Sequence, residues 1–175
     1  VYITNFNYGR YIKKSIQSVL NQTFKNYELL ILDDGSTDNS IQIIKSFSKK
    51  KNIRFIFQKN KGLNKSNTIA IKAAKGKFVL RLDADDYIDK NALLLLYNQI
   101  SASKNIGLVY SDYYLINNKN EIQKHVKNME FKESFKSFYH PAHGACSLIR
   151  KSFIEEVNFY DQRFKRQDGV DIWYK

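Results

Sequence analysis

Short apolar runs alternate with helical repeats along the first 110 residues, and this alternation constrains the fold more than any other feature. The apolar runs are residues 1–6, 27–32, 53–57 and 77–82. Near-continuous apolar runs of this length are typical of strands that are covered on both faces. The repeats between them, clearest at residues 10–22 and 64–75, predict amphipathic helices. We therefore expect an α/β protein with a mostly parallel central sheet flanked by helices.

The remaining third of the chain has a different pattern. A strand is expected at residues 107–111, followed by a hairpin through residues 117–120, which is a small antiparallel element. Residues 128–147 contain several aromatic residues and the only proline, which suggests a loop over a site or an irregular helix. Residues 146–149 are expected to return to the sheet as a strand. Because no Gly/Ser/Pro-rich linker and no internal repeat occurs, we expect one domain of two halves.

Composition narrows the classes of partner. The 175 residues include 29 Lys+Arg and 17 Asp+Glu, for a net charge of +12, and 43% are hydrophobic. Such hydrophobicity excludes intrinsic disorder. The basic residues are 23 lysines and 6 arginines without an arginine cluster, so we expect a solvated basic surface and no nucleic-acid partner. An anionic membrane and a phosphorylated substrate also match this charge.

The cysteine count and the longest apolar stretches bear on location. Cys146 is the only cysteine and cannot form an internal disulfide, so we expect a reducing, cytoplasmic location, with the inner face of the membrane as a variant of it. No apolar stretch approaches the ~18 residues of a membrane span. The chain starts at Val1 and not at a methionine, so we expect a partial chain.

Acidic residues follow two of the expected strands. Asp33-Asp34 comes after residues 27–32, and Asp83-Ala84-Asp85-Asp86 comes after residues 77–82. Ligands of an open parallel sheet bind beyond the carboxyl ends of its strands. Alternation along a strand points Asp83 and Asp85 the same way, and their oxygens suit Mg²⁺ or Mn²⁺. Aspartates also favour turns and helix starts, so the pattern alone leaves a capping role open.

Both acidic clusters, taken with further segments in register, resemble the family-2 glycosyltransferases that have the nucleotide-sugar-binding GT-A fold. The further matching segments are Ile3-Thr4-Asn5-Phe6-Asn7, Ser18-Val19-Leu20-Asn21-Gln22-Thr23, Asn60-Lys61-Gly62-Leu63, Ala73-Ala74-Lys75-Gly76-Lys77 and Gln167-Asp168 to Trp173. The resemblance implies one Rossmann-like GT-A domain over residues 1–175. Residues 1–110 would be the nucleotide-sugar-binding half, and residues 111–175 an acceptor-side half that is truncated at its C-terminus.

The resemblance also implies an activity and the residues that perform it. The activity is metal-dependent, inverting transfer of a sugar from a nucleotide-diphosphate donor, foremost a UDP-sugar, to a hydroxyl of a glycan or lipid-linked acceptor in polysaccharide or glycoconjugate synthesis. Asp85 would ligate Mn²⁺ or Mg²⁺, and Asp168 would be the catalytic base, with Asp171 as its rival. The residues expected to bind the nucleotide-sugar are Thr4, Phe6, Asp33, Asp34, Lys65 and Asp83. Lys65 is alternatively one more solvated lysine.

Three positions depart from the family pattern, and two other functions remain open. Thr4 replaces the usual proline, Asn67 replaces an arginine, and Gln167 replaces the glutamate before the expected base. His140 and His143 flank Pro141 and are expected to make loop hydrogen bonds, with an acceptor or metal contact as the alternative. The other functions are sugar-phosphate nucleotidyl transfer, which the lack of a Gly-rich phosphate loop disfavours, and a non-catalytic basic module that binds polyanions.

Overall fold

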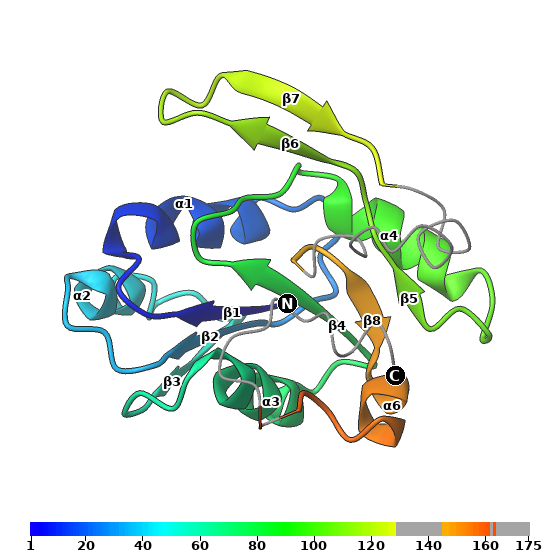
Figure 1. The fold of residues 1–175 in the computed structure, drawn as a ribbon, viewed down its shortest axis with the longest axis horizontal. Coiled ribbons are helices and arrows are strands. Elements are labelled where there is room, and N and C mark those ends of the chain that lie inside the picture. Colours follow the sequence, from blue (N-terminus) through cyan, green and yellow to red (C-terminus); the bar gives the residue numbers. More distant parts are fainter. Residues whose placement is uncertain (129–144, 162, 164–175) are drawn as a thin grey trace.

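The structure, a computed structural model, describes residues 1–128, 145–161 and 163 and contains a six-stranded sheet (Figure 1). Its strand order is β3-β2-β1-β4-β8-β5. The strands are β1 (Tyr2–Asn5), β2 (Leu29–Asp33), β3 (Ile53–Phe57), β4 (Phe78–Asp83), β5 (Leu108–Val109) and β8 (Leu148–Arg150). Strands β1 to β4 pair in parallel, whereas β8 is antiparallel to both β4 and β5. The expected mostly parallel sheet is therefore confirmed.

Helices cover both faces of this sheet. They are α1 (Gly9–Leu20), α2 (Ser40–Lys45), α3 (Leu63–Ala73), α4 (Ala92–Ser101) and α6 (Lys151–Glu156). Helices α1 and α2 lie on one face, and α3 and α6 lie on the other (Figure 1). This arrangement follows from strands that are apolar on both faces, because each face must be shielded from water.

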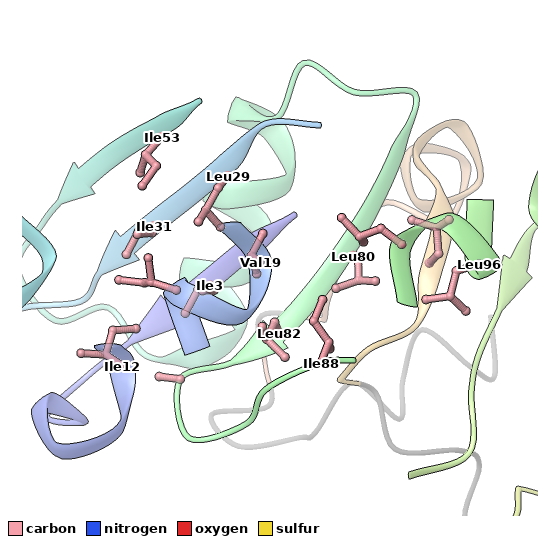
Figure 2. Packing of buried hydrophobic residues seen from close by; sticks show 14 of the residues in the cluster. Ile3, Ile12, Val19, Leu29, Ile31, Ile53, Leu80, Leu82, Ile88 and Leu96 are labelled. Atoms are coloured by element: carbon pink, nitrogen blue, oxygen red, sulfur yellow. The ribbon is translucent and has the colours of Figure 1, made fainter. Parts of the chain in front are cut away.

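The larger core lies on the face covered by α1, α2 and α4. Side chains of alternate strand residues, such as Ile3 and Leu82, pack there against Ile12 and Val19 of α1 and Leu96 of α4 (Figure 2). Burying one such side chain fully contributes roughly 1.5–3 kcal/mol. A smaller core on the opposite face joins the remaining strand side chains to α3 and α6. Two cores thus hold the carboxyl ends of the central strands in a fixed arrangement.

The expected hairpin forms a second, two-stranded sheet. Strands β6 (Tyr113–Ile116) and β7 (Ile122–Val126) pair in antiparallel fashion, with a register shift between Leu115 and Ile116. In Figure 1 the hairpin lies beyond α1, on the side away from the main sheet. Of the helices in the described part of the chain, none is long and apolar enough to cross a bilayer.

Candidate functional site

The strand order reverses direction between β1 and β4. From β1 the chain continues outward through β2 to β3, and then returns to place β4 on the other side of β1. In such sheets the crevice at the carboxyl ends, where the order reverses, is the preferred ligand site. Thr4 lies opposite Asp83 across this boundary, and Asn5 lies opposite Asp33. The structure thus brings residues from three predicted motifs to one edge.

Asp33 lies at this edge, but its carboxylate accepts hydrogen bonds from other groups of the protein. The side chain is buried, and its Oδ2 accepts hydrogen bonds from Asn5 Nδ2 (2.8 Å) and Ser36 Oγ (2.7 Å). Its Oδ1 accepts a bond from the Ser36 backbone N–H (2.9 Å). Asp33 therefore ties the end of β1 to the turn after β2, and this geometry favours an organising role for it over direct ligand contact.

Asp34 holds the loop that precedes α3. Its Oδ1 accepts bonds from Gln58 Nε2 (2.7 Å) and the Lys61 N–H (2.9 Å), and its Oδ2 accepts one from the Gly62 N–H (2.9 Å). A carboxylate oxygen has about two acceptor positions, so Oδ2 retains one. The neighbouring Gly35 has φ +84°, and a Cβ there would lie 2.8 Å from the Asn60 nitrogen. Glycine is therefore required for the loop to approach Asp34 this closely.

Thr4 and Asn67, two positions that depart from the family pattern, contact each other. Thr4 Oγ1 donates a hydrogen bond to Asn67 Oδ1 at 3.2 Å, and both side chains are buried. Asn67 Nδ2 has no partner among the described residues. Because Asn67 is fully buried, it joins α3 to β1 and does not present its amide at the surface of the site.

Asp83 forms a bidentate ion pair with Arg81, a residue that was not predicted to belong to the site. Arg81 Nε donates to Oδ1 (2.7 Å) and Nη2 donates to Oδ2 (2.9 Å). Burial alone would lower the pKa of Arg81, but the charge and hydrogen bonds of Asp83 raise the pKa above its usual range. Residues two apart in a strand share a face, so the Arg-Leu-Asp order was the signal for this pair.

Asp85 differs from the other carboxylates of the site. It lies in the turn after β4, is exposed, and has no hydrogen-bond or ion-pair partner among the described residues. The described residues also contain no group of three His, Cys, Asp or Glu side chains that could hold a metal ion by itself. A hard cation that takes most of its ligands from phosphates and water fits this arrangement, because it needs only one or two protein carboxylates.

The other predicted site residues lie at the surface or outside the described chain. Phe6 follows β1 directly and is 44% exposed, so its side chain is accessible to a ligand. Lys65 is exposed in the first turn of α3. Asp168 and its rival Asp171 lie outside the described residues, as do Gln167, His140 and His143.

The geometry can be compared with known proteins. Residues 1–157 match the model of the family described as "Glycosyl transferase family 2". The chain belongs to this family. Among curated family members, the glycosyltransferase GlyG of Streptococcus pneumoniae is 30% identical over 159 residues, which cover 90% of this chain and 48% of GlyG. The chondroitin synthase of Escherichia coli is 33% identical over 112 residues, covering 63% of this chain and 16% of the synthase.

Solved structures identify the fold as GT-A. TarS of S. aureus (residues 1–349) superimposes with a TM-score of 0.78 at 21% identity, covering 98% of this chain and 52% of that one. The mannosyltransferase PcManGT of Pyrobaculum calidifontis, solved with GDP-Man and Mn²⁺, gives a TM-score of 0.72 at 14% identity. The family-2 chain described here thus spans about half the length of the TarS 1–349 chain and of GlyG.

Proposed function

We propose that this family-2 chain binds a UDP-sugar together with Mn²⁺ or Mg²⁺ and transfers the sugar, with inversion, to a hydroxyl of a glycan or lipid-linked acceptor. The observation that carries this proposal is the exposed, unpaired carboxylate of Asp85 beside the boundary between β1 and β4. Residues 1–110 would bind the donor and residues 111–175 the acceptor. We place this activity in glycan synthesis at the cytoplasmic side of a membrane.

The two aspartates of β4 and its turn are suited to different tasks. Arg81 fixes the rotamer of Asp83, so this carboxylate presents a steady acceptor for a ribose hydroxyl. Asp85 would hold the metal, and the donor diphosphate would complete its coordination. When bound, the metal acts as a Lewis acid that stabilises the negative charge of the departing diphosphate.

The base-binding end of the site would be formed by β1 and the turn after β2. The remaining acceptor position on Asp34 Oδ2 suits the imide N–H of uracil, and the exposed Phe6 ring offers a stacking surface. TarS has been solved with UDP and with UDP-GlcNAc, which supports a uridine donor. The mannosyltransferase complex with GDP-Man makes a guanosine donor the alternative.

Transfer also requires removal of a proton from the acceptor hydroxyl. We assign this step to Asp168, on the family resemblance of Gln167-Asp168 to Trp173. A carboxylate on the side opposite the leaving group can take the proton as the hydroxyl attacks the anomeric carbon. A single displacement of this kind inverts the anomeric configuration.

Calorimetric titration of UDP with and without Mn²⁺ tests the donor site. We expect Mn²⁺ to strengthen UDP binding, and the Asp85→Ala variant to lose this gain. Asp89→Ala is the matched control, because Asp89 is an exposed carboxylate four residues further along the same segment. An equal gain from Mn²⁺ in wild type and Asp85→Ala would remove Asp85 from the metal site. Pyrophosphate release from a nucleoside triphosphate and a sugar phosphate would instead show nucleotidyl transfer.

A further inference from the structure

The β6–β7 hairpin exposes several large hydrophobic side chains to solvent. Leu115 is 49% exposed, Ile116 37% and Ile122 63%, and the Tyr114 ring is 56% exposed. A two-stranded hairpin is at best marginally stable in water unless something packs against it. Along β6, Tyr114 and Ile116 share one face of the hairpin, Ile122 pairs with Ile116, and Leu115 points to the opposite face. The exposed face of Tyr114, Ile116 and Ile122 therefore indicates a surface that is covered when the protein works.

The turn of the hairpin is joined to the donor-site half of the molecule. Lys14 of α1 donates a hydrogen bond from Nζ to Asn120 Oδ1 in the hairpin turn. The same ammonium group lies 3.4 Å from the centroid of the Tyr87 ring. Tyr87 is two residues beyond Asp85, so one lysine links the hairpin, α1 and the segment that carries the proposed metal ligand.

The charge around the hairpin is predominantly positive. The exposed cations of the hairpin and α1 are Arg10, Lys13, Lys14, Lys119, Lys124 and Lys127. Against these six stand two exposed carboxylates, both of which have partners. Asp112 lies 3.4 Å from His125 Nε2, and Glu121 accepts a hydrogen bond from Asn117. The surface is thus complementary to an anionic partner.

We propose that this surface, the hairpin together with the outer side of α1, lies on a lipid bilayer that contains anionic headgroups. Aliphatic side chains flanked by lysines and tyrosines are the composition of segments that lie in a membrane interface. A purely apolar protein surface would not use the lysines, and an acidic glycan would not use Ile116 and Ile122. The bilayer is the occupant that uses both.

This orientation would set the donor site beside the membrane. The Lys14 link places the bilayer surface next to the turn after β4. A lipid-linked acceptor could then reach the site without leaving the bilayer. The inference about the acceptor rests on the proposed function, whereas vesicle binding by the hairpin does not.

Co-sedimentation with vesicles tests the proposal. The 175-residue chain should bind vesicles of phosphatidylcholine mixed with phosphatidylglycerol, and should bind pure phosphatidylcholine vesicles at least ten-fold more weakly. Added salt should weaken binding, because it screens exposed charges. Each lysine near an anionic surface contributes roughly a five-fold gain in partitioning. We therefore expect the Lys119→Glu/Lys124→Glu variant to lose at least ten-fold, and Ile122→Asp to lose several-fold.

Two controls make the outcome decisive. Lys75→Glu/Lys77→Glu makes the same charge change at exposed lysines next to α3, on the opposite face of the sheet from α1, and should bind like wild type. Stabilisation of each variant by UDP, measured as a shift in melting temperature, reports on the donor site independently of the membrane. Equal losses in both lysine pairs, or no vesicle binding at all, would overturn the proposal. So would a dimer in light scattering that Ile122→Asp dissociates, since it would show a second copy on the hairpin.

Discussion

Arg81 donates to both carboxylate oxygens of Asp83 from two residues earlier in the same strand. The Arg81 side chain is only 5% exposed, so water cannot replace Asp83 as its partner. The ion pair therefore affects both the stability of the fold and the geometry of the site. Arg81 keeps Asp83 in place, and Arg81 is itself a buried charge that needs Asp83 as its partner.

The first prediction concerns this pair. Arg81→Met should lower the free energy of unfolding by about 2–3 kcal/mol, because it leaves a partly buried carboxylate without its counter-charge. Urea denaturation measures this loss. The variant Arg81→Lys, which keeps the charge but not the two parallel bonds, should fall between wild type and Arg81→Met. If all three proteins have the same midpoint, the pair does not stabilise the fold.

The second prediction concerns Asp34 and its loop. The carboxylate of Asp34 accepts hydrogen bonds from three N–H groups. In Asp34→Asn, the NH₂ group must face at least one of these donors. Lys61 bonds one carboxylate oxygen and Gly62 the other, so one of these two backbone amides loses its acceptor and should exchange hydrogen at least ten-fold faster, as measured by NMR. UDP affinity should fall as well. Asp89→Asn is the control, and unchanged protection at both amides would contradict the assigned role of Asp34.

The third prediction concerns the contact between Thr4 and Asn67. Thr4→Val removes the hydroxyl at nearly constant volume and should cost about 1 kcal/mol, since Asn67 Oδ1 loses its donor. Asn67→Leu removes the other partner, and a double-mutant cycle isolates their coupling. We expect the two losses to be non-additive by about 0.5–1 kcal/mol. Strict additivity in chemical denaturation would mean that the contact contributes nothing.

The fourth prediction is a pH dependence at Cys146. Burial raises the pKa of its thiol to about 11, although the Ser111 hydroxyl opposes the shift. In the unfolded chain the thiol ionises at its lower, ordinary pKa, so the unfolded state loses this proton first as pH rises. Stability should therefore fall between about pH 9 and 11 by up to 2–3 kcal/mol more in wild type than in Cys146→Ala. Parallel pH profiles of the two proteins would refute this.

Alkylation gives a second test of Cys146. The native thiol should react slowly with iodoacetamide at neutral pH, because its raised pKa leaves little thiolate and the residue is half-buried. Unfolding in urea should restore ordinary reactivity. Equal rates in the native and unfolded states would mean that Cys146 is accessible.

The sequence predicts the strands and helices well where the pattern is local. The run at residues 53–57 coincides with β3, and the amphipathic repeat at residues 10–22 with most of α1. The position of β8 could not be predicted, because its three residues carry no sign that they enter between β4 and β5. Pairing between distant segments depends on packing against the whole sheet and not on local propensity.

The candidate site could likewise be predicted only in part. The chain positions of the aspartates predicted that they would gather at the carboxyl ends of the strands. Their hydrogen-bond partners could not be predicted, because Gln58 and Lys61 reach Asp34 only through the parallel pairing of β2 with β3. Those partners separate the four carboxylates into three that are engaged, Asp33, Asp34 and Asp83, and one that is open, Asp85.

Strand β8 has a consequence for the order in which the protein can be completed. Among the described strands, β5 is hydrogen-bonded only to β8, and β8 fills the edge of β4. A nascent chain that has left the ribosome only as far as β7 therefore has an open edge on β4 and a β5 segment without a partner. Unpaired edges of this kind recruit other chains. Fragments that end before residue 148 should aggregate, because β8, the last strand in the described part of the chain, covers the edge of β4.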